Sequence, residues 1–213
     1  MDSQEAKKIV CGGGKELLRL GLVAGTWGNV SCRAGGSAMV ITPSGIPYDK
    51  LEPDDMSTVS IEDLTFEGRR PSSESPMHAA IYRTRPEVNA VIHFHSLYAC
   101  TASVLGEDVP PYLEDMAQII GPSIRISRHA LTGSPLLTEN VLDALAGRFG
   151  ALLENHGAVC AGRDMEEAFA AALILEKACQ THLLVKTAGG GRALTVEEAE
   201  KYRDFYLNSY QKR

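Results

Sequence analysis

Hydrophobic and polar positions recur along the chain with two different periods, which separate predicted helices from predicted strands. A helical period runs through residues 1–20, and we expect one amphipathic helix that ends near Gly21. Short apolar runs between turn residues predict strands at 30–33 and 38–42. Residues 90–95 predict another strand, and 150–162 predict two more around a tight turn.

Helix start and stop signals delimit the remaining helices. Ser75 is placed to cap a helix whose first position suits Pro76 and which Pro86 terminates. A second helix is expected over 96–106, directly after the preceding strand.

The longest predicted helix covers 163–189. Asp164 is its expected N-cap, Glu167 stands at the capping-box spacing, and glycines follow its end. Strands and helices are mixed without strict alternation. We therefore expect a single α/β domain over residues 1–213, with a central mixed and largely antiparallel sheet.

Three consecutive glycines at 12–14 lie inside the first predicted helix, where each costs about 1 kcal/mol relative to alanine. A phosphate-binding loop would need a preceding strand and a following Gly-Lys-Ser/Thr, and the sequence has neither. We expect close backbone packing or a weakened helical turn instead.

Composition and charge limit the classes of partner and the cellular compartment that we expect for this protein. The net charge is −6 and there is no basic cluster, which argues against a nucleic-acid partner. The N-terminus has no apolar signal core, and no uncharged apolar run approaches about 18 residues, so we expect neither secretion nor a membrane span. Five widely spaced cysteines fit reduced thiols, which is typical of the cytoplasm.

Two histidines, His93 and His95, stand one residue apart in an apolar strand. Because strand side chains alternate between faces, both imidazoles project to one side and Phe94 to the other. Two imidazoles on one face suit a zinc ion, although two histidines that only form hydrogen bonds would give the same pattern. Zinc needs three or four ligands, so further residues must contribute.

Two other residues can complete such a site. His156 lies in a glycine-flanked turn after an apolar strand, and Glu74 lies among small hydroxyl residues at a helix N-terminus. Each has an ordinary alternative: a turn histidine bound to the backbone, or an acid that stabilises the helix dipole. Three histidines and one carboxylate would form a four-coordinate site whose displaceable carboxylate leaves room for substrate.

Five motifs together resemble the class II aldolase/adducin family, and its zinc-dependent L-fuculose-1-phosphate aldolase branch in particular. They are AGTWGNVS, ITPSGIPYDKL, PSSES-x-x-H, VIHFHS and LLENHG, in the family's order and approximate spacing, and the resemblance covers roughly residues 5–210. It implies a three-layer α/β/α fold, a homotetramer with active sites between neighbouring subunits, and a small sugar phosphate as substrate.

The resemblance also implies roles for individual residues. His93, His95 and His156 correspond to the zinc ligands, and Glu74 to an acid/base residue that closes the zinc sphere without substrate. Turns with glycine amides and hydroxyl donors beside a helix N-terminus are suited to bind an anion. The residues that match the family's phosphate site are Gly28, Asn29, Ser44, Gly45, Ser72 and Ser73.

The proton donor is where the chain departs from the family. Glu114 stands where fuculose-phosphate aldolases carry a catalytic tyrosine, and Tyr112 lies two residues earlier. The methylthioribulose-phosphate dehydratase branch has a glutamate in this region. A C-terminal tyrosine reaches the active site in this family, which makes Tyr206 and Tyr210 candidate donors as well.

The expected activity is zinc-dependent, reversible cleavage of a ketose 1-phosphate to dihydroxyacetone phosphate and an aldehyde. L-Fuculose 1-phosphate and a 5-deoxypentulose or methylthioribulose 1-phosphate are equal candidates, and another divalent transition metal could replace zinc. The alternatives are a methylthioribulose-1-phosphate dehydratase, a ribulose-5-phosphate 4-epimerase, which typically has aspartate in place of Glu74, and a non-catalytic adducin-like interaction domain.

Overall fold

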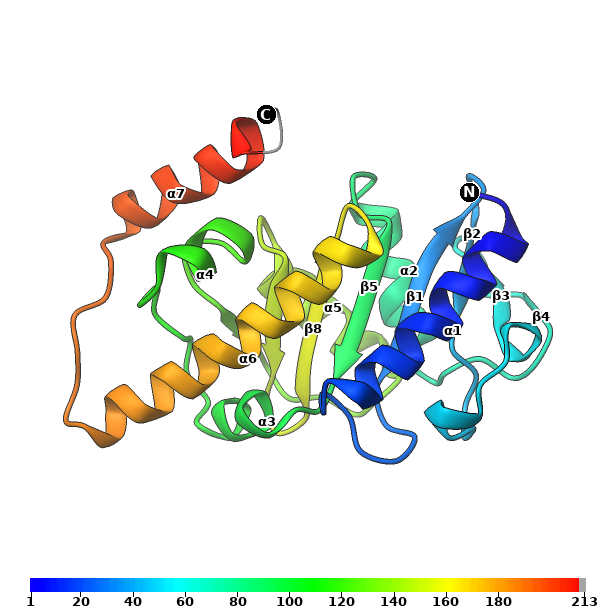
Figure 1. Ribbon diagram of the computed structural model, residues 1–213, viewed down its shortest axis with the longest axis horizontal. Coiled ribbons are helices and arrows are strands. Elements are labelled where there is room, and N and C mark those ends of the chain that lie inside the picture. The colour runs from blue at the N-terminus through cyan, green and yellow to red at the C-terminus, as the bar shows by residue number, and fades with distance from the viewer. Residues whose placement is uncertain (211–213) are drawn as a thin grey trace.

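An eight-stranded sheet forms the centre of the computed structural model, which describes residues 1–210 (Figure 1). Neighbouring strands are antiparallel except for β6 and β7, which are parallel. The predicted mixed, largely antiparallel sheet is therefore confirmed. In spatial order the strands are β4 (Phe66–Glu67), β3 (Ser57–Ser60), β2 (Ala38–Ile41), β1 (Asn29–Ala34), β5 (Ala90–Phe94), β8 (Gly157–Gly162), β7 (Gly150–Leu153) and β6 (Arg125–Ser127).

Helices cover both faces of the sheet and make three layers, as expected. Buried side chains of α1, α3, α4 and α6 form one core with the sheet, and those of α2 and α5 form a second core on the other face. Helix α7 packs against α4 (Figure 1). The helices are α1 (Ser3–Arg19), α2 (Ser75–Thr84), α3 (Leu97–Val104), α4 (Glu114–Ile119), α5 (Pro135–Leu145), α6 (Met165–Thr187) and α7 (Val196–Asn208), with short 3₁₀ turns at Tyr48–Lys50 and Pro53–Asp55.

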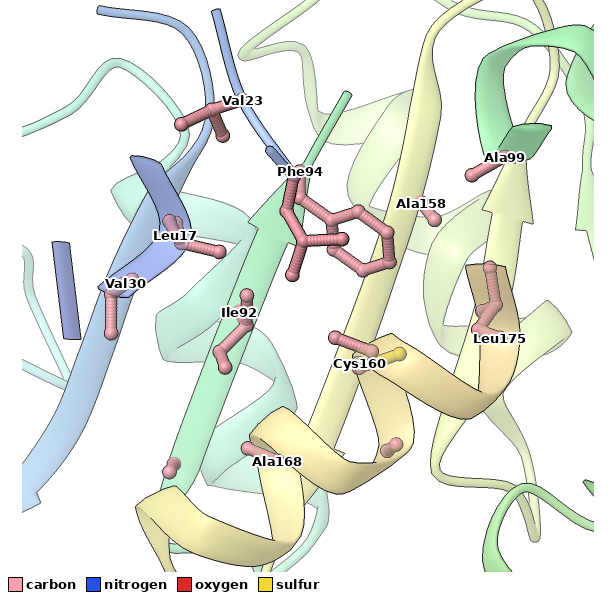
Figure 2. Close-up of a cluster of buried hydrophobic side chains, with 14 of the residues drawn as sticks. Leu17, Val23, Val30, Ile92, Phe94, Ala99, Ala158, Cys160, Ala168 and Leu175 are labelled. Atoms are coloured by element: carbon pink, nitrogen blue, oxygen red, sulfur yellow. The ribbon is translucent and has the colours of Figure 1, made fainter. Parts of the chain in front are cut away.

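The alternation along β5 decides where its histidine points. Ile92 and Phe94 lie on the same side of the strand, in the layer that α1 and α6 occupy (Figure 2). Val91 belongs to the core on the opposite face, beside α2. His93 follows the same alternation, so its imidazole lies on the α2 side.

The glycines of α1 confirm the prediction of close packing. A Cβ atom on Gly14 would lie 2.8 Å from both Leu51 and Tyr48, and one on Gly13 would lie 3.1 Å from Val30. Gly12 is exposed and has no heavy atom within 4 Å of such a Cβ. Helix α1 therefore approaches the sheet along its Gly13–Gly14 side.

The start of α2 differs from the prediction by one residue. Glu74 occupies the N-cap position without making a side-chain cap, and Ser75 and Pro76 are the first helical residues. The Ser75 hydroxyl donates to the carbonyl of Ser72. Because the Glu74 carboxylate does not cap the helix, it is available to other partners such as Asn29.

The cap of α6 is only partly as predicted. Asp164 accepts the backbone N–H of Glu167 at 2.8 Å, which confirms it as the N-cap. The capping box is wrong: the Glu167 carboxylate accepts the backbone N–H of Arg163 at 2.6 Å and the Tyr206 hydroxyl at 2.8 Å. The Glu167 carboxylate thus binds Tyr206 and the Arg163 side chain instead of the backbone N–H of Asp164.

Within residues 1–210, α6 is the one helix long and apolar enough to span a membrane by length and composition. Its buried positions, among them Ala168, Ala172 and Leu175, pack against the sheet. These positions are covered by the sheet, whereas Leu173 and Leu184 of the same helix are exposed.

Candidate metal centre and active site

His93 ends up at the carboxyl end of β5 with one ring nitrogen already engaged. Its imidazole is fully buried, and Nδ1 donates to the carbonyl of Ala158 at 3.0 Å. This bond fixes the tautomer and leaves the Nε2 lone pair free to face the site. Nε2 of His95, which follows β5, lies 2.8 Å from Nε2 of His93.

His156 reaches the same point from the turn between β7 and β8. Asn155 has a positive φ of 55°, a left-handed conformation that asparagine tolerates better than most residues. Gly157 allows the turn to approach β5, since a Cβ there would lie 2.5 Å from the Phe94 carbonyl oxygen. The three imidazole rings have centroids 4.7, 4.8 and 4.9 Å apart and stand at steep angles to one another.

Glu74 brings a carboxylate to the three histidines from the start of α2. Its Oε2 lies 3.2 Å from Nε2 of His93, and its Oε1 lies 3.6 Å from Nε2 of His156. Asn29 of β1 donates from Nδ2 to Oε2 at 2.8 Å. Glu74 is 6% exposed, and within residues 1–210 its Oε1 has no hydrogen-bond partner.

The donor set fits a divalent cation. Ligand atoms of the three histidines all lie within 4.8 Å of one another. A tetrahedral zinc site with bonds of about 2.0–2.2 Å has ligands about 3.3–3.6 Å apart. The two Glu74 oxygens lie 3.2 and 3.6 Å from their histidine nitrogens, and Nε2 of His93 and Nε2 of His95 lie closer together, at 2.8 Å. A buried carboxylate oxygen without a donor is costly unless a cation compensates its charge.

Burial keeps His93 and His95 in the neutral form that binds metals. Desolvation, followed by the neighbouring His95 and His156, holds the pKa of His93 well below its ordinary value. Burial and His156 also lower the pKa of His95. Both imidazoles are therefore neutral near pH 7, and neutral imidazole is the ligand form.

A cleft of about 580 Å³ opens beside this cluster, and His95, His156 and Glu74 lie in its wall. All six residues that match the family's phosphate site also line it, on three neighbouring turns. The hydroxyl-bearing Ser44 and Ser73 are exposed there. The lining residues from these turns are Gly28, Asn29, Ser44, Gly45, Ser72 and Ser73.

Gly28 shows why one of these turns needs glycine. Its φ is +89°, and a Cβ would lie 2.6 Å from Val23 and 2.8 Å from the His93 carbonyl oxygen. The turn can therefore lie directly against β5. The Gly28 carbonyl accepts a hydrogen bond from the Tyr48 hydroxyl at 2.6 Å, which fixes the position of the turn.

The structure adds cleft residues that the sequence did not single out. Thr132 lines the cleft from the loop between β6 and α5, and Thr26 and Asn155 also line it. Gly133 has φ +77°, and a Cβ there would lie 3.2 Å from the Ser73 carbonyl oxygen. In the sequence, the only local sign that this loop approaches Ser73 is the Thr132-Gly133 pair in a polar segment.

The candidate proton donors are not brought to the cleft of their own chain. Glu114 accepts the Tyr202 hydroxyl at 2.7 Å, between α4 and α7. Tyr206 donates to Glu167, and Tyr210 stacks on Tyr206 with ring centroids 5.8 Å apart. Helix α7 lies well away from the carboxyl end of β5 (Figure 1). Glu114, Tyr206 and Tyr210 therefore do not reach the cleft of their own chain.

Comparison with known proteins agrees with this arrangement. The family model described as class II aldolase and adducin N-terminal domain matches residues 8–183. The chain is 31% identical to 5-deoxy-D-ribulose 1-phosphate aldolase of Bacillus thuringiensis serovar kurstaki, over 92% of this chain and 93% of that protein. It is 38% identical to L-fuculose phosphate aldolase of Escherichia coli K12, over 79% of this chain and 78% of the relative.

A solved structure of an L-fuculose 1-phosphate aldolase superposes on the chain with a TM-score of 0.91. The two sequences are 32% identical, and the match covers 95% of this chain and 96% of the solved one. Fold and sequence comparisons thus point to the same group of proteins.

Proposed function

The chain belongs to the class II aldolase/adducin family, and we propose that it is a zinc-dependent aldolase that reversibly cleaves a ketose 1-phosphate. The products would be dihydroxyacetone phosphate and an aldehyde. The observation that carries the proposal is the convergence of three imidazoles and Glu74 at the wall of one cleft. The similar proteins named as fuculose-phosphate and deoxyribulose-phosphate aldolases support the substrate class.

His93, His95 and His156 would hold the zinc ion, with Glu74 as a fourth ligand that substrate displaces. Bound zinc would supply Lewis-acid stabilisation of the negative charge that develops on substrate oxygens as the carbon–carbon bond breaks. No lysine Schiff base is part of this proposal. Another divalent transition metal with a preference for imidazole would also fit the donor set.

Glu74 is the proposed acid/base residue. In the direction of synthesis its carboxylate would remove a proton from C3 of dihydroxyacetone phosphate, and in cleavage it would return that proton. The amide of Asn29 binds Oε2 and orients the carboxylate, while Oε1 carries no hydrogen bond from residues 1–210. That oxygen is the free one for proton transfer.

The phosphate group would bind where three turns and the N-terminus of α2 meet. Backbone N–H groups next to glycine can approach an anion closely, and serine hydroxyls donate to its oxygens. The α2 dipole favours negative charge at this end. The proposed phosphate-binding residues are Gly28, Asn29, Ser44, Gly45, Ser72 and Ser73.

A homotetramer with sites between neighbouring subunits would supply the missing proton donor. Glu114, Tyr206 and Tyr210 do not line the cleft of their own chain, so the proposal places one of them in the cleft of a neighbour. We also propose that this assembly works in the cytoplasm on free sugar phosphates.

Glu114 favours one second candidate, a methylthioribulose-1-phosphate dehydratase on the same scaffold. A carboxylate in place of a tyrosine could take part in removal of water instead of carbon–carbon cleavage. Product analysis separates the two, because an aldolase releases dihydroxyacetone phosphate and a dehydratase releases a diketo compound. A 4-epimerase would release neither.

The test is cleavage by metal-stripped and zinc-reloaded protein on L-fuculose, 5-deoxyribulose and methylthioribulose 1-phosphates. We expect cleavage only with metal, and none from the His93→Ala variant even after zinc is added. His129→Ala is the matched control, because that side chain is exposed and outside the cleft lining. Cleavage that survives chelation, or a lysine adduct trapped by borohydride, would overturn the zinc mechanism. A protein that binds no zinc would favour the adducin-like interaction domain.

A further inference from the structure

Helix α3 contacts both segments that carry the histidines. It starts at Leu97, two residues after His95. At its other end the carbonyl of Ser103 accepts the Asn155 backbone N–H at 3.2 Å. The Cys100 thiol donates to the carbonyl of His156 at 3.6 Å. A displacement of α3 would therefore move His95 and the His156 turn together.

The start of α3 is held by a residue from another helix. Ser96 is in the N-cap position, but its side chain does not cap the helix. Instead the Ser96 hydroxyl donates to Oε2 of Glu176 at 2.5 Å. The backbone N–H groups of Ala99 and Tyr98 donate to Oε2 at 2.9 Å and to Oε1 at 3.1 Å. One carboxylate thus replaces the usual cap and also meets the positive end of the helix dipole.

Glu176 is itself fixed by its place in α6. It is half-buried in a long helix whose neighbouring Leu175 and Cys179 are part of the core. Ala99 of α3 and Leu175 belong to the same buried cluster (Figure 2). The carboxylate therefore holds α3 against the buried side of α6. Its hydrogen bonds are charge-assisted and are stronger than neutral ones.

We propose that Glu176 is a positioning residue of the metal centre, which sets the separation of the His95 and His156 imidazoles through α3. This inference rests on the metal site proposed above. Glu176 does not line the cleft and makes no hydrogen bond to the histidines or Glu74 among residues 1–210. Its effect would reach the metal only through the position of α3.

Loss of this support should weaken zinc binding more than phosphate binding. Residues that orient metal ligands without touching the metal typically contribute about 10–100-fold to metal affinity. The phosphate turns belong to segments that precede β5, and Glu176 bonds to none of them. Glu176→Gln should therefore lower zinc affinity by about 10–100-fold and leave affinity for inorganic phosphate within about twofold of the wild type.

The experiment compares wild type, Glu176→Gln and Ser96→Ala by zinc competition with a chromogenic chelator, and by the visible spectrum of the Co²⁺-loaded proteins. Ser96→Ala removes only one of the three hydrogen bonds, so we expect a smaller fall in zinc affinity. The matched control is Asp2→Ala, which removes the cap of α1 remote from the metal ligands. It should lose stability but keep zinc affinity and the Co²⁺ spectrum.

Unchanged zinc affinity and an unchanged Co²⁺ spectrum in both variants would overturn the inference. Should Glu176→Gln fail to fold, Ser96→Ala decides the question alone by the same two readouts. A wild-type protein that binds no zinc would contradict the proposed function instead, so the two failures are distinguishable.

Discussion

The His93 imidazole shows how backbone geometry prepares a side chain for a metal. With Nδ1 bound to the Ala158 carbonyl, only Nε2 remains, and it faces Nε2 of His95 and a carboxylate oxygen of Glu74. The strand pairing that places Ala158 opposite Phe94 also orients the ring. The orientation of the His93 ring thus depends on a carbonyl that the strand pairing places beside it.

Gly28 should tolerate no side chain. In Gly28→Ala the new Cβ would combine a left-handed φ with contacts of 2.6 and 2.8 Å, so we expect a loss of about 2–4 kcal/mol in the free energy of unfolding. Urea denaturation measures it. Gly45→Ala is the control, because Gly45 has φ +78° but open space around it. Equal losses in the two variants would contradict the role of the close approach.

His78 should make the metal-free protein sensitive to mild acid. It is fully buried with Nδ1 2.7 Å from the Ser31 hydroxyl, and burial, followed by His93, lowers its pKa to about 3. The unfolded chain takes up this proton near pH 6.5, so stability present above that pH is lost as the pH falls toward 3. The free energy of unfolding should fall by up to about 1.4 kcal/mol for each pH unit below about 6.5.

The check is urea unfolding of the metal-free wild type and of His78→Gln between pH 7 and pH 5. Carboxylates contribute little in this window, because they titrate mainly below it. The variant should lose less stability on acidification than the wild type. Parallel pH profiles for the two proteins would show that His78 is protonated equally in the folded and unfolded states.

At the scale of elements, local patterns predicted most of the fold. The strand at 90–95 and the turn at 155–157 were predictable because alternation and glycine-flanked turns are local signals. The capping box at Glu167 was not, since Tyr206 competes for its carboxylate from 39 residues away. Thr132 was missed for the same reason: its loop reaches the cleft only through tertiary packing.

The glycines of α1 provide a matched pair for testing how this helix meets the sheet. In Gly14→Ala the Cβ would lie 2.8 Å from Leu51 and Tyr48, so we expect a loss of about 1–3 kcal/mol from overpacking. In Gly12→Ala no heavy atom lies within 4 Å of the new Cβ. The higher helix propensity of alanine should therefore raise the free energy of unfolding by about 0.5–1 kcal/mol. Thermal unfolding measures both changes. Stabilisation by both substitutions would contradict the close packing of α1.

At the scale of the whole molecule, the site draws on three distant segments of one chain and leaves its predicted proton donors elsewhere. The start of α2, the end of β5 and the β7–β8 turn meet at the cleft, and no residue of α4 or α7 lines it. Helix α7 lies away from the carboxyl end of β5 (Figure 1). The C-terminal tyrosine pattern alone could not predict this separation, although the family resemblance implied active sites between neighbouring subunits.

The proposed sharing of each site between two chains predicts complementation. We expect His93→Ala and Glu114→Gln to be nearly inactive alone, and a jointly refolded mixture to regain activity in sites that combine intact residues from different chains. Cleavage rates before and after mixing measure this effect. A mixture no more active than its components, or full activity of Glu114→Gln alone, would contradict the shared site or the role of Glu114.

The most direct test of the central claim is anomalous diffraction at the zinc absorption edge, on crystals grown with zinc. We expect one strong peak per chain, with Nε2 of His93, His95 and His156 each about 2.0–2.1 Å away. No peak at these three imidazoles, or a peak held by other residues, would contradict it.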